Sequence, residues 1–256
     1  MRSELLGYLC CPVCGGSLSL RKASATKGEI TYGELVCEVC GRLYPIRNGV
    51  PNFIVSECLK TINKVSKIFY NIYAPLYDTV ERKLAMLSGF KEEDLRNEIV
   101  SRMEIKQGHN VLEIAIGTGG NIPYFRKYTD ELIVGLDISE RMLSTCLNKI
   151  KKYSWRNIEL VLGCAEYLPF KSGMFDRLLV GGGITYFGDV GRALKEVSRV
   201  VKNNAKVVIY DQVTFIDRMR EKDKVVLKYL PKDLKLINYT YLFDKRFYVI
   251  ELVKKG

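Results

Sequence analysis

The second half of the chain alternates short apolar runs with amphipathic segments. The apolar runs that predict strands begin at Asn110, Leu132, Leu160, Met174 and Lys206. Helical patterns lie between several of them, most clearly at 190–202. Strands that alternate with helices pack as parallel neighbours with helices on both faces. The pattern therefore predicts an α/β fold with a Rossmann-like, doubly wound, mostly parallel sheet.

Two further strand-like segments close the chain. Residues 234–241 and 247–253 are rich in aromatic and β-branched residues, and a polar turn joins them. They predict an antiparallel hairpin. The lysine-rich end of this hairpin is interpreted as solvated protection of the sheet edge.

A helical periodicity runs through residues 57–105, the predicted connector. Its apolar stripe consists of Leu59, Ile62, Val65, Phe69 and Ile72 and is interrupted at Pro75. Tyr70, Tyr73 and Tyr77 gather at the interruption. From the residues alone, these tyrosines are interpreted as packing the helix against the core.

The first 56 residues carry two Cys-x-x-Cys pairs, each followed by glycine. The pairs are Cys11 with Cys14 and Cys37 with Cys40. Glycine tolerates the backbone angles that turn both sulfurs of a pair toward one ion. Four thiolates close a tetrahedral Zn²⁺ site and leave no position for water or substrate, so the metal is predicted to be structural. Cys10 is the alternative to Cys11 and would lengthen its knuckle by one residue.

The segment between and after these pairs predicts a small antiparallel sheet. Residues 17–20 and 30–36 alternate in polarity around Lys27-Gly28, and Asn48-Gly49 marks a further turn. Residues 1–56 are therefore predicted to form a zinc ribbon.

Composition restricts the class of protein. With 256 residues and 47% apolar content, the chain can bury one α/β core and a small module. No apolar run reaches the roughly 18 to 20 residues of a membrane span, and the start lacks the apolar core of a secretion signal. We therefore expect a cytoplasmic protein without a membrane span, in which paired cysteines favour metal over disulfides. Cys58, Cys146 and Cys164 are interpreted as ordinary buried thiols.

The formal net charge of +11 raises the question of nucleic-acid binding. Residues 1–56 carry nearly balanced charges, so the excess lies in the rest of the chain. Scattered surface lysine is the favoured interpretation, and an RNA-binding face is the alternative.

A glycine-rich turn follows the first strand of the second half. Residues 110–121 read NVLEIAIGTGGN, an apolar strand that ends in a turn and then a helix. Glycine lets a ligand approach the backbone closely, and a helix start offers free N–H groups. The next strand ends in Asp137, whose carboxylate can accept both hydroxyls of a ribose. Asp137 alternatively caps the helix that follows Ser139, and both roles are compatible.

Five motifs resemble, in order, the class I S-adenosylmethionine-dependent methyltransferases, most closely the group of ubiquinone and menaquinone C-methyltransferases. The motifs are VLEI..GTGGN at 111–121, GLDIS..ML at 135–143, AE.LPF at 165–170, FD at 175–176 and AL.EV.RVVK at 193–202. The resemblance covers about residues 65–256. It implies a methyltransferase domain over 106–256, with 57–105 as its lid or connector.

The resemblance also implies S-adenosyl-L-methionine as the cofactor and a set of contacts to it. The implied contacts are Glu113, Gly117, Thr118 and Gly119 for the cradle, Asp137 for the ribose, Ile138 and Met142 for the adenine faces, and Ala165 and Glu166 for its edge.

Three positions depart from the pattern of this family. Ala115 stands where the family usually has glycine, so the turn must accommodate a methyl group. Cys164 stands where an aspartate commonly holds the adenine amino group. Asn-Asn-Ala at 203–205 replaces Pro-Gly-Gly, although asparagine also tolerates a left-handed turn. The turn lacks the full G-x-G-x-x-G spacing, which leaves a dehydrogenase as a minor alternative.

Residues 4–54 resemble the zinc-ribbon activator subunits that partner tRNA and translation-factor methyltransferases. The shared elements are CP.C at 11–14 and YPI..G.P at 44–51. The domain order is also similar to that of rRNA guanine methyltransferases that begin with a zinc module. The resemblance implies that the ribbon can dock a protein partner.

On the acceptor side, the candidates are Tyr77, Tyr186 and Asp189. Methyl transfer needs an in-line approach rather than an obligatory base, so no catalytic base is assigned. The chain lacks the Asn/Asp-Pro-Pro-Tyr element of enzymes that methylate planar amino groups. The predicted function is transfer to a small, quinone- or lipid-like acceptor. An RNA- or protein-directed methyltransferase that docks through the ribbon and a non-catalytic binding protein are the alternatives.

Overall fold

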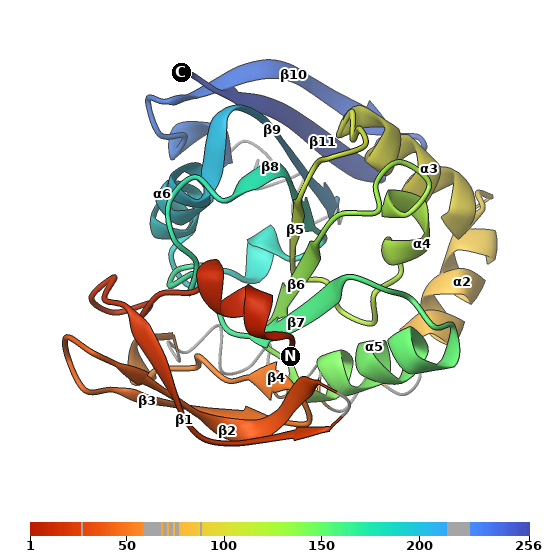
Figure 1. Cartoon of the computed structure of the whole chain (residues 1–256). Helices are drawn as coiled ribbons and strands as arrows, with labels where there is room; N and C mark the ends of the chain where they lie inside the picture. Colours follow the sequence, from red (N-terminus) through yellow and green to blue (C-terminus); the bar gives the residue numbers. More distant parts are fainter. Residues whose placement is uncertain are drawn as a thin grey trace.

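The computed structural model describes residues 1–26, 28–58, 68, 71, 74, 77–87, 89–213 and 226–256. Within these residues the chain forms a four-stranded sheet near the N-terminus and a seven-stranded sheet that carries the helices (Figure 1). No helix in the described ranges combines the length and apolar character needed to cross a bilayer.

The seven-stranded sheet is mostly parallel, as predicted. Its strands are β5 (Val111–Ile114), β6 (Ile133–Asp137), β7 (Ile158–Leu162), β8 (Phe175–Gly181), β9 (Val201–Gln212), β10 (Leu234–Leu242) and β11 (Phe247–Lys254). Their spatial order is β10-β11-β9-β8-β5-β6-β7. Strands β5 to β9 run parallel, whereas β11 lies antiparallel between β9 and β10. The second strand of the closing hairpin, β11, therefore pairs with β9, and the first strand, β10, forms the edge of the sheet.

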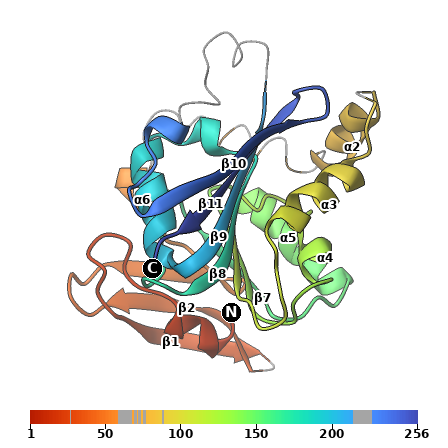
Figure 2. The ribbon, with the colours of Figure 1, turned by 90° about the horizontal axis from the view of Figure 1, so that it is seen from above.

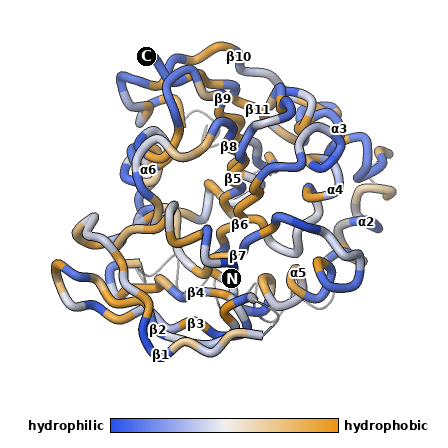
Figure 3. Tube along the Cα trace, viewed as in Figure 1, coloured by the Kyte–Doolittle hydropathy of each residue, from blue (hydrophilic) through white to orange (hydrophobic). Residues whose placement is uncertain are grey.

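Helices cover both faces of this sheet. Helices α3 (Glu92–Arg102), α4 (Ile122–Phe125) and α5 (Glu140–Lys152) lie on one side, and α6 (Val190–Val200) lies on the other (Figure 2). Val111 packs with Ile99 of α3, while the next residue, Leu112, packs in the core that contains Val197 of α6. Alternation along the strand thus directs neighbouring apolar side chains to opposite layers. The central strands β5 and β6 are apolar along most of their length (Figure 3).

Strand β9 follows α6 directly, and residues 203–205 lie near the start of this strand. Asn204 adopts a left-handed backbone with φ of 62°. Asparagine therefore supplies at this turn the conformation that glycine supplies in the family's usual pattern.

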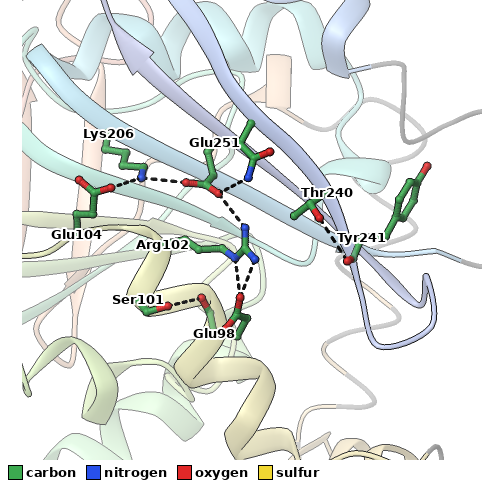
Figure 4. A network of polar contacts seen from close by, with 9 residues as sticks. Glu98, Ser101, Arg102, Glu104, Lys206, Thr240, Tyr241 and Glu251 are labelled. Atoms are coloured by element: carbon green, nitrogen blue, oxygen red, sulfur yellow. Dashed lines mark hydrogen bonds and ion pairs between the residues drawn. The ribbon is translucent and has the colours of Figure 1, made fainter.

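The buried carboxylate of Glu251 connects α3 to strand β11. Glu251 of β11 accepts from Arg102 of α3 at 2.8 Å and contacts Lys206 of β9 at 2.9 Å (Figure 4). Glu98 and Glu104 complete the pairing of these two cations. Because each charge in the network has an opposite partner, the burial of Glu251 is compensated.

The N-terminal sheet has the predicted antiparallel hairpins. Its strands are β1 (Leu18–Thr26), β2 (Glu29–Cys37), β3 (Leu43–Arg47) and β4 (Val50–Pro51), after the 3-10 helix η1 (Ser3–Gly7). Gly28 closes the first hairpin with φ of 80°, and Asn48 and Gly49 turn the last one with φ of 52° and 79°. These are the left-handed angles that such tight turns require.

The ribbon is joined to the large sheet at β7. The Phe53 N–H donates to the Leu162 carbonyl at 2.7 Å, and Asn52 forms a parallel bridge with Leu162. On the other flank, Leu9 forms an antiparallel bridge with Phe170. Phe53 is fully buried in a core shared by the ribbon and the sheet. The two parts are therefore packed as one hydrophobic unit.

The connector is described only in part. It begins with the 3-10 helix η2 (Ser56–Cys58) and continues with α2 (Tyr77–Leu87) and α3, which are helical as predicted. The predicted stripe and interruption fall outside the described residues: Leu59, Ile62, Val65, Phe69, Tyr70, Ile72, Tyr73 and Pro75.

Cys58 and Cys164 form a disulfide, with Cα atoms 6.0 Å apart. The prediction that both are ordinary thiols is wrong, whereas Cys146 is a free, buried thiol as predicted. The pairing of Phe53 with Leu162 brings the end of the ribbon beside the loop after β7. A sequence separation of 106 residues conceals this proximity.

Candidate functional site

The glycine turn and the end of β6 are joined by one carboxylate. The Gly117 N–H donates to Oδ2 of Asp137 at 2.8 Å, and the Ser139 N–H donates to Oδ1 at 2.8 Å. Ser139, rather than Asp137, caps α5, because its hydroxyl accepts from the Met142 N–H. The capping alternative for Asp137 is therefore incorrect. Asp137 instead fixes the turn relative to the neighbouring strand.

Burial alters the protonation of this carboxyl. It raises the pKa of Asp137 to about 6, while the N–H groups of Ser139 and Gly117 act in the opposite direction. Each carboxylate oxygen has a second lone pair. Asp137 can therefore hold the turn and still accept from a ligand hydroxyl.

A pocket opens where the carboxyl ends of β5, β6 and β8 meet. Its wall consists of Tyr77, Ile114, Ala115, Gly117, Leu136, Asp137, Ile138, Met142, Gly163, Cys164, Ala165, Glu166, Gly181, Gly182, Gly183, Tyr186 and Phe187. The structure thus brings together most of the predicted contacts, from the turn, the end of β6 and the loops after β7 and β8. The crevice beyond the carboxyl ends of parallel strands is where ligands bind in open α/β sheets.

Thr118 and Gly119 lie behind the pocket wall. The Thr118 hydroxyl donates to Asp78 of α2 at 2.5 Å and accepts from Lys149 of α5 at 3.0 Å. Gly119 has φ of 78°, and a Cβ there would approach Cys146 Sγ to 2.6 Å. These two residues thus set the shape of the turn and tie it to α2 and α5.

Glu113 is also outside the pocket wall. It is 1% exposed, and its Oε1 accepts from Nδ2 of Asn121 at 2.6 Å. Burial raises the pKa of Glu113 to about 8, although Asn121 and Arg96 lower it. Arg96 and Asn121 were not singled out from the sequence. Asn121 stands in the quoted motif, but nothing local marks Arg96, which precedes it by a whole strand.

Among the acceptor-side candidates, Tyr77 and Tyr186 line the pocket, whereas Asp189 does not. Asp189 caps α6, and its Oδ1 accepts from the Arg192 N–H at 2.9 Å. Glu166 accepts from the Gly188 N–H at 2.7 Å and so fixes the loop before this helix. Asp189 therefore has a structural role at the start of α6.

Four sulfurs converge at the end of the ribbon, as predicted. The Sγ atoms of Cys11, Cys14, Cys37 and Cys40 lie within 4.8 Å of one another. Measured separations are 3.7 Å for Cys11–Cys40 and 3.4 Å for Cys14–Cys37. Zn–S bonds of about 2.3 Å in a tetrahedron give sulfurs about 3.8 Å apart, so the cluster fits zinc.

The backbone around the cluster follows the expected knuckles. Gly15 and Gly41 have φ of 73° and 71°. Gly16 allows close approach of the two knuckles, because a Cβ there would meet Val39 Cγ2 at 2.7 Å. Cys10 lies outside the cluster, and its N–H donates to the Pro169 carbonyl. Cys11 therefore occupies the ligand position.

The sheet order and the position of the pocket match the fold of class I S-adenosylmethionine-dependent methyltransferases. The model of the ubiE/COQ5 methyltransferase family matches residues 58–236, and the chain belongs to this family. The model of Trm112p-like proteins matches residues 2–49. The N-terminal resemblance to an activator subunit is thereby confirmed.

Curated relatives match part of the chain. The chain is 34% identical over 155 residues to a demethylmenaquinone methyltransferase of Lactococcus lactis, with 57% of each chain covered. It is 32% identical over 150 residues to the enzyme of the same name from Listeria welshimeri, covering 58% of this chain and 62% of that one. The chain thus spans about 60% of the length of these relatives.

Solved structures share the fold. The cyclase SpnF superposes with a TM-score of 0.62 at 13% identity, covering 77% of this chain and 97% of that one. A Haloferax volcanii complex of the Trm112 methyltransferase activator with a methyltransferase gives a TM-score of 0.58 at 12% identity, covering 73% and 98%. At such identities the likeness establishes the architecture alone.

Proposed function

We propose that the chain transfers the methyl group of S-adenosyl-L-methionine to a small, apolar acceptor of the quinone or lipid type. The observation that supports this is the composition of the pocket wall. Among its described lining residues only Asp137 and Glu166 are charged, and none is lysine or arginine. A nucleic-acid acceptor needs cations near the reacting atom, whereas apolar walls suit a small acceptor. The names of the relatives, which refer to demethylmenaquinone, agree with this class.

The proposed contacts to the cofactor follow the pocket wall. Asp137 accepts the ribose hydroxyls through its remaining lone pairs, and Gly117 leaves the backbone open beside it. Ile138 and Met142 pack on the adenine, with Ala165 and Glu166 at its edge. Glu113, Thr118 and Gly119 act from behind the turn.

Methyl transfer depends mainly on how the acceptor is positioned. When bound, S-adenosyl-L-methionine supplies an electrophilic methyl group on a sulfonium. When the acceptor is held in line with that group, the bimolecular reaction becomes effectively unimolecular. We assign this holding to Tyr77 and Tyr186, which flank the pocket, and to the space left by Gly181, Gly182 and Gly183.

We further propose that Cys11, Cys14, Cys37 and Cys40 bind one structural Zn²⁺. Four thiolates complete its coordination, so the metal stabilises the ribbon and takes no part in the transfer. The Tyr44 hydroxyl lies 3.0 Å from Cys11 Sγ and would donate to the metal-bound sulfur.

A methyltransferase directed at RNA or protein is the second candidate function. The match to Trm112p-like proteins favours it, since it suggests a ribbon that serves a macromolecular substrate or partner. Against this, the ribbon is packed on the seven-stranded sheet of the same chain, where Phe53 pairs with Leu162. We propose that it supports the attached domain in place of a separate activator.

The test is methyl transfer by the zinc-loaded chain. Labelled S-adenosylmethionine is offered with a demethylated naphthoquinol or with total tRNA, and label is counted in each. We expect transfer to the naphthoquinol, and label in tRNA instead would reverse the choice of acceptor. In calorimetry, Asp137→Ala should weaken binding of S-adenosylhomocysteine about tenfold or more. Asp130→Ala, an exposed carboxylate outside the pocket, should not change it.

A further inference from the structure

The guanidinium of Arg96 lies directly on the glycine turn. A Cβ added to Gly120 would meet the guanidinium of Arg96, so the side chain crosses the turn at this glycine. Arg96 comes from α3, where its Nε donates to Glu92 at 2.9 Å. Its Nη1 donates to Oδ1 of Asn121 at 2.9 Å. Arg96 is therefore fixed at both ends, between the helix and the turn.

Arg96 determines the orientation of the Asn121 amide. A guanidinium only donates hydrogen bonds, so the amide oxygen must face Arg96 and the amide nitrogen must face away. That nitrogen donates to Oε1 of Glu113 at 2.6 Å. The three side chains form a directed chain of hydrogen bonds that ends on the carboxyl of Glu113.

The second carboxyl oxygen of Glu113 has no donor among the described residues. Oε2 is buried and unpaired, in a side chain that is itself 1% exposed. The carboxyl lies beside the pocket wall, because a Cβ on Gly181 would come within 2.9 Å of Oε1. Leaving a buried acceptor unsatisfied costs about 1–3 kcal/mol, more for a charged group. Such a group beside a ligand pocket indicates a donor that arrives with the ligand.

We propose that Arg96 and Asn121 are positioning residues that direct the Glu113 carboxyl at the ammonium group of the cofactor's amino-acid end. This inference rests on the proposed function, because it takes the ligand to be S-adenosylmethionine or its demethylated product. Both carry one ammonium group, which is the kind of donor that the free oxygen lacks. A charge-assisted hydrogen bond of this type is among the strong ones.

The surroundings of Glu113 make this recognition dependent on protons. The titratable groups that face it are Arg96 of α3, Asp137 of β6, Cys146 of α5 and Tyr210 of β9. Burial dominates and raises the pKa of Glu113 to about 8. The free protein therefore holds a proton on most copies of this carboxyl at pH 7. An ammonium group beside it favours the ionised form, so ligand binding transfers that proton to the buffer.

Calorimetry with two ligands tests the positioning role. S-Adenosylhomocysteine and 5′-methylthioadenosine share the adenosine and the thioether, but only the first has the ammonium group. Asn121→Leu and Arg96→Met should weaken binding of the first about tenfold, the equivalent of one charge-assisted hydrogen bond. Binding of the second should change less than about twofold, because none of the three side chains contacts adenosine. The matched control is Asn97→Leu, an exposed amide on the same helix, which should leave both affinities unchanged.

The outcomes separate this inference from the proposed function. Equal losses for both ligands, or no loss for either, would overturn the positioning role. A wild-type chain that binds neither ligand would overturn both proposals.

Proton release is measured by repeating the titrations at pH 7 in phosphate and in Tris, which differ in ionisation enthalpy. We expect release of up to one proton with S-adenosylhomocysteine, and none with 5′-methylthioadenosine or with the variant Glu113→Gln. Heats that are the same in the two buffers would overturn the proton coupling.

Discussion

The methyl group of Ala115 lies against the backbone of Gly183. A Cβ added to Gly183 would sit 3.0 Å from the Cβ of Ala115, closer than side chains normally approach. Ala115 itself has φ of 61°, in the left-handed region. The family usually has glycine at this position of the turn after β5, whereas this chain has Ala115. The residue opposite it, in the loop after β8, is Gly183.

This pairing predicts coupled effects on stability. Ala115→Gly should raise the free energy of unfolding by up to about 1 kcal/mol, because glycine adopts the left-handed angle without strain. Gly183→Ala should lower it by about 1–3 kcal/mol through the clash with the Ala115 methyl. In the double variant the clash is absent, so part of that loss should return. Urea denaturation of all four proteins measures the cycle, and strictly additive effects would contradict the contact.

The disulfide predicts a stability that depends on the redox conditions. Cys58 and Cys164 are separated by 106 residues. Closing a loop of this length stabilises the folded state by roughly 3–5 kcal/mol in the chain-entropy model. Cys58→Ser should therefore be less stable than the wild type under oxidising conditions and match it in a reducing buffer. A wild type that is equally stable in both buffers would show that the bond contributes nothing.

The cysteine cluster predicts one zinc ion per chain. Cys37→Ser should lose the metal, whereas Cys10→Ser should keep it, because Cys10 lies outside the cluster. Metal content by atomic absorption distinguishes the two variants. Since Phe53 buries the ribbon against the sheet, loss of zinc should also lower the melting temperature of the whole chain. Retention of full metal content by Cys37→Ser would refute the assignment.

Glu113 predicts that stability declines as pH rises toward 8. Its pKa is raised from the ordinary 4.5 to about 8 in the folded chain. Between these values the folded state holds a proton that the unfolded state has lost, so the free energy of unfolding falls as pH increases. Asp137 acts in the same direction only up to about pH 6.

Comparison of the wild type with Glu113→Gln between pH 6 and 8 therefore measures the contribution of Glu113. The decline over this range should be shallower in Glu113→Gln, whose side chain does not titrate. Asp130→Ala serves as the control for a lost surface carboxylate, and it should keep the wild-type slope. The same decline in Glu113→Gln as in the wild type would exclude Glu113 as its source.

The sequence predicted the features that are local to one strand or turn. The glycine turn and Asp137 each mark the end of an apolar run, and parallel pairing of β5 with β6 brings such ends together. The cluster of four cysteines was predicted for the same reason, because their spacing and trailing glycines are local signals. Periodicity predicted the strands and the closing hairpin, whereas the strand order was not predicted.

Contacts between distant segments were not predicted. Arg96 reaches the glycine turn from another helix, and no local pattern in the sequence marks it. The disulfide depends on how the ribbon packs, which no periodicity reports. Ser139, not Asp137, is the cap, because α5 begins at Glu140 and the Ser139 hydroxyl accepts from the Met142 N–H.

The bridge between Asn52 and Leu162 has a consequence for self-association. An open sheet exposes unpaired N–H and C=O groups at two borders, and either can recruit a strand from another molecule. Here the ribbon covers the border at β7 near its carboxyl end. Within the described chain, the border left uncovered by strand pairing is that of β10. Any assembly of copies by strand addition would therefore have to proceed there, at the border opposite the ribbon.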